Sequence, residues 1–313
     1  MLTFRIAMIL PVRFGAIMSQ SIYRRRLIYG ILLNAASALS FYFATFFVRV
    51  GTLSNPEIPS QAYAFVRYLT GFFFSIYLFR RAGLTFRLKV PNALYFRAIF
   101  NTLALLFFYE SVASGNAATA NVLNMTYPAF VALLAIPLLS EIPDRRMLLV
   151  LVFSLTGIGI YVLTPLIRSG TISHSDLWGL GSGLLAALAI LALRGAAMQA
   201  RAEEILLWMF GIGSIATLPI VLSDIPDLLS PSVIWVFLSA LLGIAGQWLL
   251  TRSYEHLSAT AGSIVSSLRI PIALIAGFFL LQEVPGLSGV LGAALIFAGN
   301  LFLALFRRAE KKE

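Results

Sequence analysis

The chain consists largely of apolar segments that are each long enough, or nearly long enough, to cross a lipid bilayer as an α-helix. A helix that spans the bilayer needs about 20 mostly apolar residues. Ten such segments follow one another, at residues 27–48, 62–79, 98–113, 119–139, 147–166, 177–198, 205–222, 233–250, 258–281 and 287–306. The connections between them are short and contain turn-forming pairs such as Asn55-Pro56 and Pro285-Gly286. We therefore expect an all-α integral membrane protein with ten transmembrane helices.

The composition excludes most other classes of protein. Of the 313 residues, 59% are hydrophobic and 12% are charged, whereas a soluble domain has about 25% charged residues. An ordinary soluble enzyme, a disordered chain and a nucleic-acid-binding module are thereby excluded. The absence of cysteine excludes disulfides, thiolate metal sites and cysteine nucleophiles, and two histidines, His174 and His256, are too few for a histidine metal cluster. We expect no metal and no cofactor.

The ends of the chain are expected to be tails in the cytoplasm, at residues 1–26 and 307–313. A cleaved signal peptide is an alternative for the first tail, but no small-residue cleavage site follows the apolar stretch. An amphipathic segment lying on the membrane surface is a further alternative. Met18 is a second candidate start, so the sequence leaves open whether residues 1–17 belong to the native protein.

The net charge of +10 is explained by the orientation of the chain in the membrane. With the amino terminus in the cytoplasm, all but four of the 23 lysines and arginines fall in cytoplasmic loops and tails, with Arg97 counted in the second loop. The third span is short, and its extension back through Tyr95 and Arg97 is the alternative. Arg49 and Arg168 fall outside, and Arg67 and Arg269 lie within helices. Because cytoplasmic loops carry an excess of basic residues, this distribution predicts that both termini are cytoplasmic.

Two stretches of the sequence resemble each other. Residues 118–143 and 259–285 each begin with Ala-Thr-Ala, continue to a mid-helix proline (Pro128 or Pro271) and end in Leu-Leu-x-Glu-x-Pro. Two apolar helices that share these residues by chance are the alternative.

The spacing of these stretches divides the chain into two halves of five helices, 27–166 and 177–306. Because five is odd, the second half must enter the membrane from the opposite side. Inverted repeats of this kind are typical of secondary transporters, which bind substrate near the bilayer midplane between the halves.

With these features, the chain resembles the drug/metabolite transporter superfamily, of the EamA type. The resemblance covers residues 27–306 and is carried by the ten helices, the repeat, the proline segments, and Asn55-Pro56 followed by Phe-Val-Arg-Tyr at 65–68. It implies export or exchange of small organic solutes, such as amino acids and other metabolites, through a central cavity. It also implies that a monomer suffices, since both halves are on one chain.

Arg269 is the residue that most needs an explanation. It lies near the middle of the ninth predicted helix, where a cation costs about 3 kcal/mol on insertion scales, and it shares a helical face with Gly262 and Ser266. An arginine binds a carboxylate or phosphate through two parallel hydrogen bonds. Arg269 is therefore a candidate anchor for an anionic substrate. The alternative is a structural arginine, satisfied by carbonyls freed at Pro271 or by Glu110.

Further candidates come from polar residues in the predicted helices. The predicted substrate-binding set is Arg269, Ser266, Asn121, Asn124, Tyr127, Asn101, Tyr42, Gln247 and Trp248. For each of them hydrogen bonding or packing between helices is the alternative, and for Trp248 it is an interfacial anchor.

Four charged residues are candidates for gating or coupling. Arg67 is near the outer end of its helix, from which it could reach the interface. Glu110 is a candidate proton carrier or ion-pair partner of an arginine. Glu141 and Glu283 occupy matching helix ends and are interpreted as helix-end or gate residues.

These features predict a secondary-active or facilitative transporter of small organic metabolites, amino-acid-like or otherwise bearing a carboxylate or phosphate, that works by alternating access. The alternatives are a multidrug or cation exporter, and a non-transporting scaffold or receptor subunit. The first helix lacks the central glutamate that proton-coupled multidrug relatives carry, and no ATP-binding motif occurs. No cluster of acids or histidines supports a membrane enzyme. The expected location is the inner (plasma) membrane, with the lipid bilayer and a small-molecule substrate as partners, and a proton or counter-substrate is left open.

Overall fold

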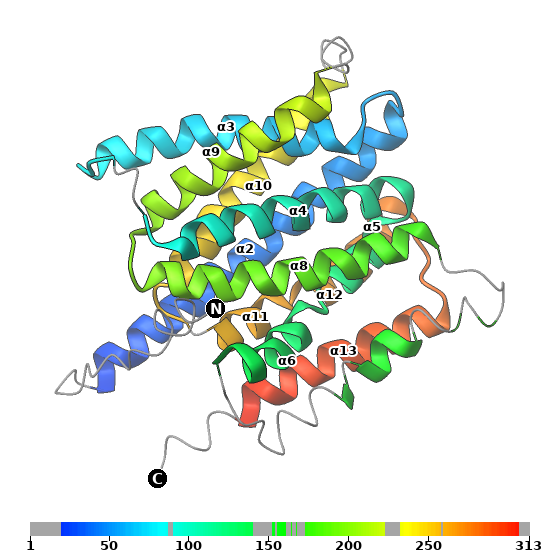
Figure 1. The fold of residues 1–313 in the computed structure, drawn as a ribbon. Helices are drawn as coiled ribbons and strands as arrows, with labels where there is room; N and C mark the ends of the chain where they lie inside the picture. The colour runs from blue at the N-terminus through cyan, green and yellow to red at the C-terminus, as the bar shows by residue number, and fades with distance from the viewer. Residues whose placement is uncertain are drawn as a thin grey trace.

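The computed structural model describes residues 20–86, 90–139, 173–222, 232–257 and 259–306, with short stretches between 152 and 167. Every regular element in these ranges is an α-helix (Figure 1). The helices are α2 (Gln20–Ser54), α3 (Ser60–Arg81), α4 (Asn92–Ser114), α5 (Ala117–Asn124), α6 (Tyr127–Leu139), α8 (His174–Ala197), α9 (Ala202–Val221), α10 (Val233–Ser253), α11 (Ala259–Ser266), α12 (Arg269–Leu281) and α13 (Leu287–Phe306).

The helices cover the predicted spans apart from 147–166, most of which lies outside the described residues, as do residues 1–19 and 307–313. Two helices begin before the predicted spans. Helix α2 begins at Gln20, within the predicted tail. Helix α4 begins at Asn92, after Pro91, so that Arg97 lies inside the helix and not in the loop before it.

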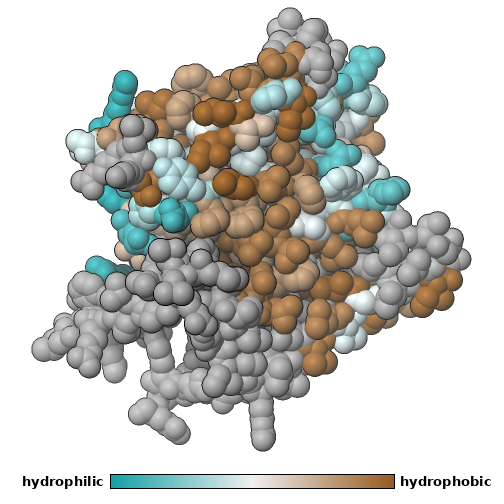
Figure 2. Space-filling view, viewed as in Figure 1, coloured by the Kyte–Doolittle hydropathy of each residue, from teal (hydrophilic) through white to brown (hydrophobic). Residues whose placement is uncertain are grey.

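The surface of the bundle is that of a multi-pass membrane protein. Six of the described helices, α2, α3, α4, α8, α9 and α10, are long and apolar enough to cross a bilayer. Figure 2 shows hydrophobic side chains over the middle of the visible face and hydrophilic ones toward its left and right edges, where the helices end. Large apolar side chains such as Phe73, Ile215 and Leu241 are exposed on these helices, as expected where lipid replaces water.

Two of the predicted spans are broken in the middle. Each of the single helices expected at 119–139 and 258–281 is two shorter helices, α5 and α6 or α11 and α12, joined by a two-residue turn. The breaks precede Pro128 and Pro271, because proline has no N–H to donate to the carbonyl four residues earlier, which belongs to Asn124 or Ser267. Helix α5 contacts α12, and α6 contacts α11. The two breaks therefore lie together inside the bundle.

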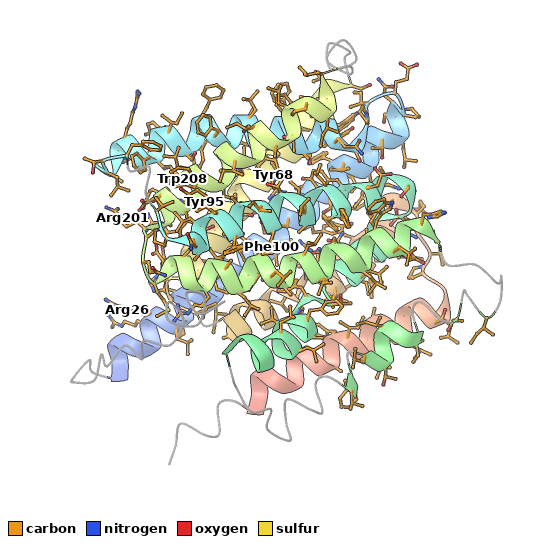
Figure 3. All side chains as sticks on the ribbon, in the orientation of Figure 1. Arg26, Tyr68, Tyr95, Phe100, Arg201 and Trp208 are labelled. Atoms are coloured by element: carbon orange, nitrogen blue, oxygen red, sulfur yellow. The ribbon has the colours of Figure 1, made fainter. Side chains whose placement is uncertain are left out.

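Basic side chains gather at one end of the bundle. Arg26 and Arg201 lie toward the same end in Figure 3, and the last turns of α3, α8 and α10 bring further arginines to it. Arg201 and Arg252 both pair there with Glu203. Among the described lysines and arginines near helix ends, Arg49 is the one at the opposite end. We call these the basic end and the Arg49 end.

At the Arg49 end, a carboxylate from the second half of the chain caps a helix of the first half. Helix α12 ends at Gln282 in a left-handed conformation (φ 55°), and the Glu283 N–H donates to the Gly277 carbonyl at 3.1 Å. This turn directs Glu283 to the start of α5, where its two oxygens accept the N–H groups of Ala117 and Ala118, each at 3.0 Å.

Arg49 completes this arrangement. Its Nε lies 3.3 Å from Oε1 of Glu283, and its Nη1 donates to the carbonyls of Val112 and Ala113 at the end of α4, at 3.4 and 3.3 Å. Arg49, Glu283 and the first N–H groups of α5 form what we call the Glu283 clamp, which joins α2, α4, α5 and α12. The structure thus places Glu283 at a helix end, as expected, whereas Glu141 lies outside the described residues.

Replacement of Glu283 by alanine is expected to destabilise the protein. The Glu283→Ala variant loses two charge-assisted hydrogen bonds and an ion pair, at a cost of about 1–3 kcal/mol. The melting temperature of the detergent-purified protein should fall. Glu57→Ala, which removes an exposed acid at the same end, is the control and should melt like the wild type. Equal melting temperatures for both variants would contradict a capping role.

Candidate functional site

A cavity of about 100 Å³ lies where the two broken helices meet. Both halves of the chain contribute to it, through α2, α3, α4, α5, α6, α8, α10, α11 and α12. The lining residues are Ala38, Phe41, Thr45, Arg67, Arg97, Asn101, Ala104, Leu105, Phe108, Tyr109, Asn124, Met125, Tyr127, Ala186, Ala189, Ile190, Gln247, Leu250, Ser266 and Arg269. Three of these residues are arginines, and none is an aspartate or glutamate.

Arg269 links the two breaks. It is the first residue of α12 and is 6% exposed. Its Nη2 donates to Oδ1 of Asn124, the last residue of α5. Its Cζ lies 5.2 Å from the ring centre of Phe108 and 5.8 Å from that of Phe41, where a guanidinium group is attracted by the ring faces. Arg269 is thus held by an amide and two aromatic rings, and by no carboxylate in the described chain.

The helical face predicted for Arg269 is buried along its length. Gly262, Ser266, Ala273 and Gly277 are all inaccessible to solvent. The face continues across the break, because the turn at residues 267–268 interrupts the hydrogen bonding without reversing the direction of the chain.

Arg67 faces the same cavity. It is 4% exposed, it donates to the Tyr109 hydroxyl at 3.1 Å, and its Cζ lies 5.2 Å from the Phe41 ring centre. Helix α10 makes room for it at Gly243, where a Cβ would lie 2.7 Å from Nε of Arg67. The expectation that Arg67 reaches toward the interface is wrong, because its side chain points into the bundle.

Arg97 is a cavity residue that the sequence prediction missed. It is 2% exposed, and its Nε and Nη2 have no hydrogen-bond partner in the described part of the chain. It was counted in the second loop, with extension of the third helix back through it as the alternative. Pro91-Asn92, which is typical of a helix start, and the spacing of Arg97, Asn101 and Phe108 along one helical face could have identified it.

The three arginines make the cavity electropositive. The ion pairs formed by the described residues lie at the ends of the bundle, and Arg67 repels both Arg97 and Arg269. Two helix N-termini and two helix C-termini meet at the breaks, so their partial charges oppose one another and the arginines determine the sign of the field. Because a buried cation without a counter-charge is costly, such a cavity favours an anion.

Five other predicted residues line the cavity, namely Asn101, Asn124, Tyr127, Gln247 and Ser266. Several of them also hold helices together. Ser266 donates to Asn34 of α2 at 2.7 Å, and Asn34 donates to Ser253 of α10 at 3.0 Å. Asn101 donates to the Tyr68 hydroxyl at 2.9 Å. These residues therefore line the cavity and also hold helices together.

The remaining candidates lie outside the lining. Asn121 donates to the Ala117 carbonyl of its own helix at 2.8 Å, while Tyr42 is fully buried and Trp248 packs against the apolar core. Glu110 accepts from Ser60 and Gln61, at 2.7 and 3.3 Å. Pairing of Glu110 with an arginine is not found among the described residues, so that expectation is wrong there. No three potential metal ligands converge in the described chain.

The family model and the relatives found by comparison with known proteins all describe transporters. The model of the EamA-like transporter family matches residues 28–163 and again residues 174–305. The pseudopaline exporter CntI of Pseudomonas aeruginosa (strain UCBPP-PA14) is 24% identical over 279 residues, which cover 88% of this chain and 95% of the exporter. An uncharacterized transporter of Helicobacter pylori (strain J99) is 28% identical over 220 residues, or 67% of this chain and 72% of that protein.

A solved structure shares the fold. The crystal structure of another protein superposes on this chain with a TM-score of 0.61. The two sequences are 16% identical, and the match covers 93% of this chain and 100% of the other.

The packing of α9 against Tyr68, beside the cavity, leaves no room for a larger residue than glycine at position 213. Gly213 of α9 lies against the buried ring of Tyr68, and a Cβ there would be 2.3 Å from a ring carbon. Gly213→Ala should lower the stability by about 1–3 kcal/mol, because neither the ring nor the helix can move freely. Gly195→Ala is the control, because its Cβ would meet its nearest neighbour at 3.6 Å. If both variants kept the wild-type melting temperature in detergent, this packing would be looser than described.

Proposed function

The chain belongs to the EamA-like transporter family, and we propose that it is a secondary-active or facilitative transporter of small organic anions. The substrates are amino-acid-like or other metabolites that bear carboxylate or phosphate groups. The observation that carries this proposal is the cavity between the halves, in which three buried arginines face no acidic side chain.

The cavity supports Arg269 as the substrate anchor. The guanidinium groups of Arg269 and Arg67 lie over the same Phe41 ring, so one anionic group placed between them would interact with both. Asn124, Asn101, Tyr127, Gln247 and Ser266 are the proposed polar contacts around it.

The same charges argue against the alternative of a cation or multidrug exporter, because three guanidinium groups repel a cation. The cavity volume of about 100 Å³ is also below the range of about 300–1,000 Å³ for sites that hold drug-sized ligands. A scaffold or receptor subunit without transport is disfavoured by the transporter family to which the chain belongs.

We propose ten helices in two inverted halves, 27–166 and 177–306, with both termini in the cytoplasm. The two family matches and the matching helix breaks support this arrangement. Polar contacts at opposite ends support it as well. Arg49 of α2 donates to the end of α4, the third helix of the first half, and Arg194 of α8 donates to the Tyr254 carbonyl at the end of α10, the third helix of the second half. The basic end is the proposed cytoplasmic face of the inner membrane.

Alternating access requires each face to close in turn. In the present structure the Glu283 clamp joins both halves at the Arg49 end. We propose that this clamp must separate for the outer face to open, and that Glu110, at the same end, is the candidate coupling residue.

The relative that exports pseudopaline supports export as the direction of transport. A monomer is sufficient for this scheme, because both halves are on one chain.

Counterflow into proteoliposomes tests the proposal. Radiolabelled succinate, glutamate and phosphate should accumulate in liposomes preloaded with the same unlabelled solute, and the cations lysine and tetraphenylphosphonium should not. Arg269→Met should reduce accumulation at least tenfold. It should not lower the melting temperature of the free protein, because it removes a buried charge without a counter-charge.

Arg80→Met, at an exposed position, is the matched control and should transport normally. Unchanged anion transport by Arg269→Met would overturn the anchor role. A lower melting temperature with normal transport would show that Arg269 is structural.

Asn124→Asp provides a complementary prediction. The new carboxylate would accept from Arg269 where the amide oxygen does now, and would occupy the arginine as an internal anion. We expect a higher melting temperature together with a loss of succinate, glutamate and phosphate accumulation. Asn116→Asp is the control, because Asn116 caps α5 through its side-chain oxygen and aspartate caps equally well. Anion transport that survives Asn124→Asp would contradict the proposed site.

A further inference from the structure

We propose that Arg97 forms a second anionic subsite, so that the preferred substrate carries two separated negative groups. This inference rests on the proposed function and specifies the substrate class. It assigns one anionic group to Arg269 and Arg67, and the other to Arg97.

The position of Arg97 separates it from the other two arginines. Arg97 and Phe108 are both on α4 and both line the cavity. At 1.5 Å per residue, their backbones are about 16 Å apart along the helix axis. Arg269 lies over the Phe108 ring, whereas Arg97 is near the start of α4, toward the basic end. The backbone of Arg97 therefore joins the cavity lining about three helical turns from that of Phe108, whose ring Arg269 covers.

Arg97 has two buried donor atoms without a partner in the described chain, Nε and Nη2, whereas Arg67 and Arg269 each have one, Nε. Arg269 donates to Asn124 and Arg67 donates to Tyr109. For Arg97, the described part of the chain offers no hydrogen-bond acceptor to Nε or Nη2, although the side chain is 2% exposed. Buried polar groups almost always have a partner, so these donors point to a group that binds from the cavity.

A purely structural arginine in this protein has a different environment. Arg49 and Arg194, near the two ends of the bundle, both donate to backbone carbonyls at the ends of neighbouring helices. These contacts give Nη1 of each guanidinium group backbone acceptors within the protein and join two helices. For Nε and Nη2 of Arg97 there is no such acceptor among the described residues. Its donors therefore suit a ligand better than they suit a structural role.

The charge balance leads to the same substrate class. A monoanion bound between Arg269 and Arg67 leaves Arg97 without a counter-charge in a site where Arg67 already repels it. A second carboxylate or phosphate on the same substrate removes this cost and bonds the free donors. The selectivity for a dianion over a monoanion should therefore depend on Arg97, while the binding of a monoanion should not.

Matched acids and amides test this inference. The probes are malonate, succinate, glutarate and adipate, each compared with its monoamide, which keeps the length and loses one charge. Ligand-induced shifts of the melting temperature give the affinity of the detergent-purified full chain for each probe. We expect the best-fitting diacid to bind at least tenfold more tightly than its monoamide. Arg97→Gln should reduce that ratio to about one without changing the affinity for the monoamide.

The outcomes separate this inference from the proposed function. An unchanged ratio in Arg97→Gln, or equal wild-type affinities for diacid and monoamide, overturns the second subsite and leaves the transport of anions standing. Loss of monoamide binding in Arg97→Gln also overturns it, because Arg97 would then act on the first group or on the fold. Arg97→Lys, which keeps the charge, should restore part of the ratio if the fold is intact. Failure of every diacid and monoamide to bind the wild type overturns both proposals.

Discussion

Arg269 begins α12, Asn124 ends α5, and the hydrogen bond between them joins the two helix breaks inside the bundle. The breaks exist because Pro128 and Pro271 interrupt the backbone hydrogen bonding of two helices that would otherwise cross the membrane unbroken. Their meeting creates polar backbone at a depth where lipid-exposed irregular structure is not tolerated. The surrounding helices therefore have to enclose it, and the cavity, its polar lining and its arginines lie within that enclosure.

The arginines at this junction reduce stability in favour of a binding site. Removal of a charge from water is offset only by close counter-charges and hydrogen bonds. In the described chain those counter-charges are at the helix ends, where they join helices, and not around Arg67, Arg97 and Arg269. A protein selected for stability alone would place leucine or methionine at these positions. A low dielectric also strengthens the attraction between the arginines and an anion, so the same environment that makes them costly makes them selective.

Much of this architecture is predictable from the sequence, because apolar length and helical period are local properties. The helices and the buried face of Arg269 follow from them. The breaks do not, since the segments around Pro128 and Pro271 are apolar enough on average to be predicted as single spans. Arg97 was missed for a related reason, because a window that scores hydropathy stops at a charged residue even where the helix continues. Asn121 and Tyr42 show the remaining limit: a helical face can be read from spacing, but the neighbour that covers it depends on the packing of helices far apart in the sequence.

The Glu283 clamp has a consequence for how such a chain can be assembled. The carboxylate that completes the first turn of α5 comes from a residue more than 160 positions later in the chain, and it arrives only when the second half has been synthesised. Until then two N–H groups at the start of α5 have no acceptor from Glu283. A gene split between the halves would therefore yield fragments that reach their mature form only when they are produced together, as complementing parts of one protein.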